Sequence, residues 1–164
     1  MVQDAAGTVH PARTWRFSQA LAAEDVAYAV FGAIAMALHG LPRATADLDL
    51  FIQPAPENVE RLKRALARVW DDPPIDEISP EDLCGDYPAV RYYPPTGFFL
   101  DIVTRLGTAF TWDGLEIEEK RYEGIPVRVV SPKTLWRMKR GTVRPSHRFD
   151  AALLAKRFGL EEAP

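Results

Sequence analysis

Residues 43–52, RATADLDLFI, set two aspartates one residue apart inside an apolar run. Side chains alternate across a strand, so Asp47 and Asp49 share one face while the leucines beside them point to the other. Adjacent carboxylates repel each other, and burying either one costs free energy unless a cation pairs with it. A divalent metal removes this difficulty, because hard oxygen ligands suit Mg²⁺ or Mn²⁺. The alternative is a strand end whose two aspartates face water.

The composition is that of an ordinary globular chain. Its 164 residues are 47% hydrophobic and 26% charged, which allows a single domain with a real core. A net charge of −3 and a pI of about 5.6 give no global basic field for nucleic acid, although a local basic patch is compatible with them. Cys84 is the single cysteine, so a reducing cytoplasm is the expected compartment. No run approaches the roughly 18 apolar residues of a membrane span.

Periodicity predicts an α+β protein with one domain over residues 1–164, beginning with a loose leader over residues 1–12. Helices are expected over residues 13–25, 33–40, 56–70, 131–141 and 146–159. Strands are expected over residues 26–32, 45–53, 90–93, 98–104 and 125–130. Residues 71–88 are acidic and proline-rich, which is typical of a loop. This order predicts a mixed, twisted sheet flanked by helices, with a C-terminal helical pair over residues 131–160.

Two neighbours of the aspartate pair favour a catalytic interpretation. The first predicted strand ends at Gly32 and feeds a helix, whose free N–H groups and dipole favour a phosphate; a tight turn is the alternative. Asp101 lies alone in the apolar strand over residues 98–104. It could converge on the aspartate pair as a third ligand, or it could cap a turn or pair with an arginine.

Together these residues resemble the nucleotidyltransferase superfamily of the DNA polymerase β type, and within it the branch related to the AbiEii toxins of type IV toxin–antitoxin systems. The matching residues are Gly32, Ala33, Ala35, His39, Gly40, Arg43, Thr45, Asp47, Asp49 and Asp101. The C-terminal part is similar too, with Lys139 ending LWRMK and Asp150 ending RPSHRFD. The family usually has Gly-Gly or Gly-Ser where this chain has Gly32-Ala33, so a hydroxyl that would contact a phosphate oxygen is missing.

The resemblance implies a nucleotidyltransferase fold and transfer of a nucleotide from a triphosphate such as ATP to an acceptor hydroxyl, with release of pyrophosphate. Asp47, Asp49 and Asp101 would hold two Mg²⁺ or Mn²⁺ ions, and Asp101 would help to remove the acceptor's proton. Nucleotide and phosphate contacts would come from Gly32, Ala33, Arg43, Thr45, Lys139 and Asp150, the last holding the lysine in place. The acceptor is left open among an RNA 3′ end such as that of tRNA, a protein and a small molecule such as an aminoglycoside. A toxin would also have an antitoxin protein as partner.

Several residues keep a structural alternative. Arg43 could form a salt bridge with the acidic segment over residues 71–86, and Lys139 could be a solvated lysine. His39 ends a short helix, where the negative end of the dipole suits it, and a structural role is favoured over a catalytic one. In the last helix, four apolar side chains are expected to face inward: Phe149, Leu153, Leu154 and Phe158. Tyr92 or Tyr93 could contact a nucleobase, although a place in the core of the sheet is favoured for both.

Other protein classes that use D-x-D fit less well. A dehalogenase-type phosphatase has Gly-Thr or Gly-Val after its second aspartate, whereas Leu50-Phe51 follows here. A metal-dependent glycosyltransferase needs a longer nucleotide-binding half before the motif. The serious rival is a nucleotidyltransferase fold that no longer catalyses and serves as a binding or regulatory module. Ala33 favours that rival, and the retention of all three aspartates opposes it.

Overall fold

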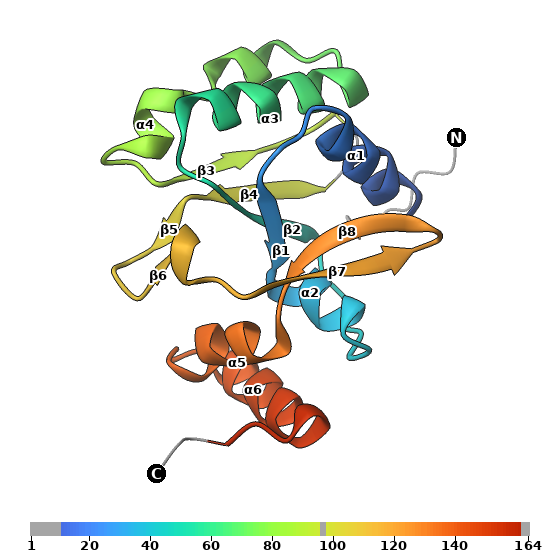
Figure 1. The fold of residues 1–164 in the computed structure, drawn as a ribbon, viewed down its shortest axis with the longest axis vertical. Coiled ribbons are helices and arrows are strands. Elements are labelled where there is room, and N and C mark those ends of the chain that lie inside the picture. Colours follow the sequence, from blue (N-terminus) through green and yellow to red (C-terminus); the bar gives the residue numbers. More distant parts are fainter. Residues whose placement is uncertain (1–10, 96–97, 162–164) are drawn as a thin grey trace.

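A six-stranded mixed sheet forms the centre of the protein in the computed structural model, which describes residues 11–95 and 98–161 (Figure 1). The strand order is β3-β4-β2-β1-β8-β7. The bounds are β1 Tyr28–Phe31, β2 Asp47–Ile52, β3 Ala89–Tyr92, β4 Phe99–Val103, β7 Ile117–Tyr122 and β8 Ile125–Val130. β2 runs parallel to β4 and β1 parallel to β8, while the other neighbours are antiparallel. The predicted mixed sheet of an α+β protein is therefore confirmed.

Helices cover the sheet and extend the molecule at one end. The longer ones are α1 Pro11–Ala23, α3 Pro56–Val69, α5 Pro132–Arg140 and α6 Pro145–Phe158, and the shorter ones are α2 Gly32–Leu38 and α4 Pro80–Cys84. α1, α3 and α4 lie at one end of the molecule, and α5 packs on α6 at the other (Figure 1). Within the described part of the chain, no helix combines the length and apolar character needed to cross a bilayer.

The helix α3 shows how the sequence pattern builds the core. Proline at its first position suits a helix start, and its buried apolar residues fall at helical spacing on one face: Val59, Leu62, Ala65 and Leu66. Beneath the helices, most apolar side chains of β2 and β4 are buried, including Leu50, Phe51 and Ile102. Burying each large aliphatic or aromatic side chain stabilises the fold by about 1.5–3 kcal/mol. The aspartates of the same two strands alternate with the leucines, so their carboxylates point to the other face of the sheet, toward the site described below.

Two segments differ from the sequence prediction. The expected loop over residues 71–88 contains a 3₁₀ turn, Pro73–Glu77, and the helix α4. Ser79 caps α4 by accepting the backbone N–H of Asp82 at 3.1 Å, a helix-start signal that the prolines concealed. The strand β7 was not predicted, because this edge strand carries the charged sequence IEEKRY and has no buried apolar face. Before β7, the chain forms a small hairpin of two strands, Arg105–Leu106 (β5) and Phe110–Thr111 (β6), and then the 3₁₀ turn Trp112–Gly114.

The ends of the chain also correct the prediction. α1 begins at Pro11, inside the expected leader; residues 1–10 lie outside the described part. In α6 the expected inward face was wrong for two residues, because Phe149 is 65% exposed and Phe158 is 37% exposed. The buried residues are instead Asp150, Ala151 and Leu154. The helix turns this face toward α5 because the buried lysine there requires an anionic partner, which Asp150 supplies.

Candidate active site

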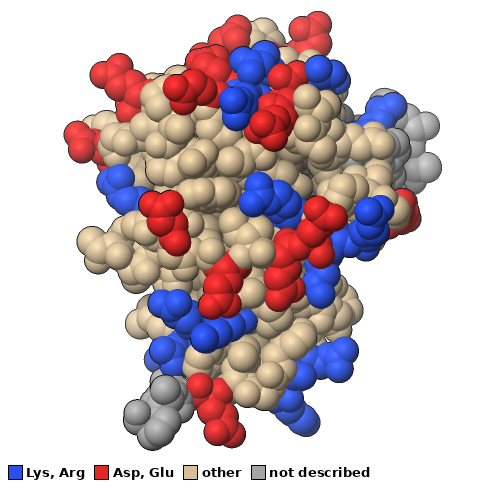
Figure 2. Space-filling model, in the orientation of Figure 1, with Lys and Arg blue, Asp and Glu red and all other residues tan. Residues whose placement is uncertain are grey.

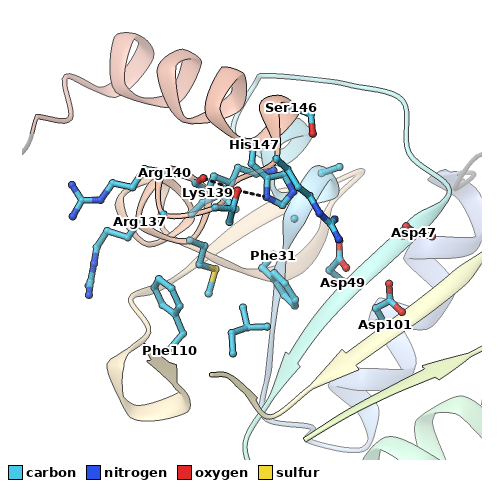
Figure 3. A pocket seen from close by; sticks show the side chains of 18 of the residues that line it. Phe31, Asp47, Asp49, Asp101, Phe110, Arg137, Lys139, Arg140, Ser146 and His147 are labelled. Atoms are coloured by element: carbon cyan, nitrogen blue, oxygen red, sulfur yellow. Dashed lines mark hydrogen bonds between the residues drawn. The ribbon is translucent and has the colours of Figure 1, made fainter. Parts of the chain in front are cut away.

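The sheet register brings the three aspartates to one place. β2 and β4 are parallel neighbours in which Asp49 lies opposite Asp101 and Asp47 lies opposite Phe99. Partners opposite each other in a sheet share a face, so the three carboxylates lie on the same side of the sheet. Figure 3 shows them on adjoining strands at the border of one cavity. The structure thus brings together the aspartates that sequence analysis singled out.

Asp49 is a partly buried carboxyl group in the middle of this set. Burial raises its pKa to about 7, with further contributions from the negative charges of Asp101 and Asp47. Lys139 and Arg91 oppose this rise, and do so incompletely. Without a further cation, the folded protein therefore holds Asp49 near the midpoint of its titration at neutral pH. The neighbouring carboxylates also disfavour the ionised form of Asp49, and a divalent cation bound beside it would relieve this.

Residue 32 has to be glycine because the Asp49 side chain packs closely against it. It has a φ of +70°, and a Cβ added there would lie 2.0 Å from an Asp49 carboxylate oxygen. No real side chain tolerates such a contact, so only glycine allows the turn from β1 to α2 to pack against the carboxylate. The sequence pattern predicts that this glycine allows a phosphate to approach; in the structure it allows Asp49 to approach. Ala33 follows it and lines the same cavity.

A buried ion cluster connects the loop before β2 to the C-terminal helices. The Lys139 Nζ of α5 donates to the Asp150 Oδ2 of α6 at 2.7 Å, and these side chains are only 6% and 3% exposed. Arg43, 107 residues away in sequence, donates to the same oxygen. Both alternatives for the basic residues were therefore wrong: Lys139 is not solvated, and Arg43 pairs with Asp150 rather than with the acidic segment. One carboxylate compensates two cations, so the cluster retains a net positive charge.

Arg91 is a site residue that the sequence pattern did not indicate. It lies opposite Asp101 in the β3–β4 pair, and its Nε and Nη2 donate to the two Asp101 oxygens at 2.7 and 2.8 Å. Its guanidinium also lies over the Phe99 ring, 5.5 Å from the ring centre. The available signal was the isolated position of Asp101, for which an arginine partner was one interpretation. A single sequence does not reveal which arginine reaches it.

Four other candidates make structural contacts. The Thr45 hydroxyl accepts the Asp47 N–H at 3.2 Å, which turns the chain into β2. The buried His39 ring donates from Nε2 to the Val130 carbonyl at 2.8 Å, since a carbonyl can only accept. Burial lowers the pKa of His39, so the ring is held neutral and is not the cation expected at a helix end. Tyr92 is buried with its hydroxyl on Asp72, whereas Tyr93 is exposed and packs edge-on against Phe99.

The three aspartates, Lys139 and Arg43 line one cavity of about 970 Å³ between the sheet and the α5–α6 pair (Figure 3). Its lining contains three acidic residues and six Lys or Arg residues: Asp47, Asp49, Asp101, Arg43, Arg91, Arg137, Lys139, Arg140 and Arg144. Figure 2 shows basic side chains gathered over the α5 region of the surface. Carboxylates and cations that face one cavity match a metal ion bound to a polyanion.

The donor set fits a divalent cation on the two adjacent aspartates. Mg²⁺ typically binds one or two protein carboxylates and completes its coordination with waters and substrate phosphates. Asp47 and Asp49 provide that pair, and burial together with the nearby carboxylates of Asp101 and Asp47 raises the pKa of Asp49. Among the residues that the structure describes, no three His, Cys, Asp or Glu side chains form a ready-made metal cluster. Both oxygens of Asp101 accept hydrogen bonds from Arg91 instead.

The fold defines the class: this protein has the nucleotidyltransferase fold. It is similar over 88% of its length to 89% of a proposed nucleotidyltransferase of Thermotoga maritima, with a TM-score of 0.51 and 14% identity. Similarity to ANT(2″)-Ia, solved in complex with adenylyl-2″-tobramycin, covers 91% of this chain and 89% of that one, with a TM-score of 0.57 and 15% identity. An antigenic nucleotidyltransferase-like protein of Paracoccidioides brasiliensis is similar over 89% of this chain and 75% of that one, with a TM-score of 0.56 and 18% identity. No protein-family profile and no curated sequence matches the chain, so the closer resemblance to AbiEii toxins stays a prediction.

Proposed function

We propose that this protein is a metal-dependent nucleotidyltransferase that transfers a nucleotide from a triphosphate such as ATP to an acceptor hydroxyl and releases pyrophosphate. One observation supports this most strongly. The carboxylate pair of β2 lines the same cavity as Lys139 and Arg43, the two cations that Asp150 holds together. A metal at the carboxylates and a phosphate chain reaching the cluster would complement both charges. The neighbouring solved structures share the fold that this reaction uses.

The residues of the chain divide the work by charge. Asp47 and Asp49 would hold Mg²⁺ or Mn²⁺, which when bound neutralises charge on the transferring phosphate. Lys139 and Arg43 contribute the positive potential for the outer phosphates, with Asp150 holding both side chains in place. Asp101, across from Asp49, would take the proton of the attacking hydroxyl once Arg91 has left it. Since phosphoryl transfer asks for little covalent work by the protein, positioning and electrostatics carry the rate.

The charge of the cavity rim bears on the acceptor. Arg137, Arg140 and Arg144 lie on α5 and the turn that follows it, and they would repel a polycation such as an aminoglycoside. An anionic acceptor such as an RNA 3′ end is the better match. Incubation with each labelled triphosphate, and with RNA, protein and small-molecule pools in turn, identifies the labelled acceptor. A cytoplasmic toxin paired with an antitoxin protein is the biological setting that the AbiEii resemblance suggests.

Mg²⁺ and ATP together are expected to raise the melting temperature by more than the sum of their separate effects. The metal lacks ligands without the phosphates, and the phosphates lack a counter-charge without the metal. A ligand that binds only the folded state stabilises it by about 2.7 kcal/mol at a hundredfold excess over Kd. Differential scanning fluorimetry with Mg²⁺, ATP, both, and ATP with EDTA measures this. Merely additive shifts would contradict a shared metal–phosphate site.

The second candidate function, a non-catalytic nucleotide-binding module, is favoured by Ala33, which lines the cavity where the family usually has glycine or serine. We expect Ala33→Ser to lower the KM for the triphosphate by one to two orders of magnitude if its hydroxyl reaches a phosphate. A hydrogen bond to a charged group contributes about 1.5–3 kcal/mol. Steady-state kinetics measures the change, and Ala37→Ser, on an exposed position of the same helix, is the matched control. Binding without turnover in both the wild type and Ala33→Ser would favour the module.

A further inference from the structure

The Arg91 side chain is hydrogen-bonded to Asp101, the third carboxylate of the site. Its guanidinium makes two nearly parallel hydrogen bonds to Asp101, at 2.7 and 2.8 Å, which engage both carboxylate oxygens. This bidentate arrangement is the strongest form of ion pair between side chains. The Arg91 side chain is 46% exposed and that of Asp101 is 24% exposed. The pair therefore lies at the open side of the cavity, where solutes can reach it.

The same pair lies directly beside the aspartates proposed to bind metal. Asp101 is the cross-strand partner of both Arg91 in β3 and Asp49 in β2, so one row across the sheet reads arginine, aspartate, aspartate. A divalent cation that used Asp101 as a ligand would have to displace the guanidinium. Even a cation held only by Asp47 and Asp49 would be repelled by the arginine. The positive charge of Arg91 thus opposes metal binding at this site.

We infer that Arg91 is a positioning residue that makes metal binding depend on the nucleotide. In the free protein, the Arg91 guanidinium pairs with Asp101 and so keeps this carboxylate from binding a metal ion. A triphosphate offers the guanidinium a second bidentate partner, because its planar fork matches phosphate oxygens as well as carboxylate oxygens. When Arg91 turns to the phosphates, Asp101 becomes available to the metal or to the acceptor hydroxyl. The inference rests on the proposed function, since it assumes that a metal–triphosphate complex is the ligand.

Equilibrium binding of Mn²⁺ without nucleotide tests this directly, by electron paramagnetic resonance of the free ion. We expect Arg91→Met to bind Mn²⁺ at least tenfold more tightly than the wild type, because the competing cation is gone. Arg91→Lys, which keeps the charge but loses the fork, should restore much of the weak binding. Arg128→Met is the matched control: Arg128 is an exposed strand arginine opposite Glu119, in β8 and away from the cavity. It should leave the Mn²⁺ affinity unchanged.

A second titration with ATP present separates the inference from the proposed function. The wild type should gain far more Mn²⁺ affinity from ATP than Arg91→Met does. If the wild type and Arg91→Met bind nucleotide-free Mn²⁺ equally, while both bind Mn²⁺ with ATP, the role of Arg91 is overturned and the proposed function stands. If no variant binds Mn²⁺ with or without ATP, the proposed function itself fails. Circular dichroism of each variant, with Arg91→Gln as a second substitution, confirms that the folded state is compared throughout.

Discussion

Asp49→Asn is expected to abolish nucleotide transfer while the protein stays folded, and Asp47→Asn is expected to do the same. The two carboxylates share a face of β2 and together form the metal-binding pair of the proposed mechanism. Removing either charge leaves the metal with a single carboxylate and lowers its affinity at the phosphates. Incorporation of label from a triphosphate into the acceptor measures the loss. Asp113→Asn, in a turn outside the cavity, should retain full activity.

The Asp49→Asn substitution should also stabilise the metal-free protein at neutral and alkaline pH. The pKa of Asp49 is about 7 in the folded state against an ordinary 3.8, so the folded state binds a proton more tightly than the unfolded chain. The stability that this proton contributes is complete below about pH 4 and is lost as pH rises through 7. At pH 8 the Asp49→Asn variant avoids this loss, which amounts to up to about 4 kcal/mol.

Urea unfolding of the wild type and Asp49→Asn in EDTA at pH 4.5, 6 and 8 tests the sign. The free energy of unfolding of the variant should gain on that of the wild type as the pH rises. A loss of stability at pH 8 without metal would mean that the carboxylate is a structural group that favours the fold. In that case the absence of activity could no longer be attributed to metal binding.

The second large effect is expected from Asp150→Asn, which should destabilise the protein by about 3–5 kcal/mol. The change leaves Lys139, with a side chain only 6% exposed, as a buried cation without its anion. Arg43 loses the same partner. Replacing Lys139 and Asp150 together by Met and Leu should recover much of this loss, because an apolar pair of similar volume leaves no uncompensated buried charge.

Urea denaturation of the single and double variants measures these differences. Glu118→Gln is the control, since its pair with Lys120 is 3.7 Å long and both side chains are about 40% exposed. Exposed pairs of this kind contribute roughly 0–1 kcal/mol. If Asp150→Asn costs no more than this control, the Lys139–Asp150–Arg43 cluster does not anchor the C-terminal helices to the site. The positive wall of the cavity would then be free to rearrange.

The sequence alone determined the parts of this protein that depend on local periodicity. The alternation in residues 47–52 predicts a strand with both aspartates on one face, and the strand is there. The helical spacing in residues 56–70 likewise predicts α3. Such patterns act through neighbours a few residues apart, so a single chain displays them. The same reasoning indicated Gly32, although the carboxylate it accommodates comes from another strand.

Only the tertiary structure decided which charges meet. Arg43 and Asp150 are 107 residues apart in sequence, and nothing in the local pattern of either one selects the other. Arg91 finds Asp101 through the register of β3 on β4, and that register depends on packing across the whole sheet. The exposed Phe149 has the same origin, because α6 turns Asp150 rather than the aromatic face toward Lys139. Buried charge requires a partner wherever the fold can supply one, and that requirement outweighed the apolar pattern of the helix.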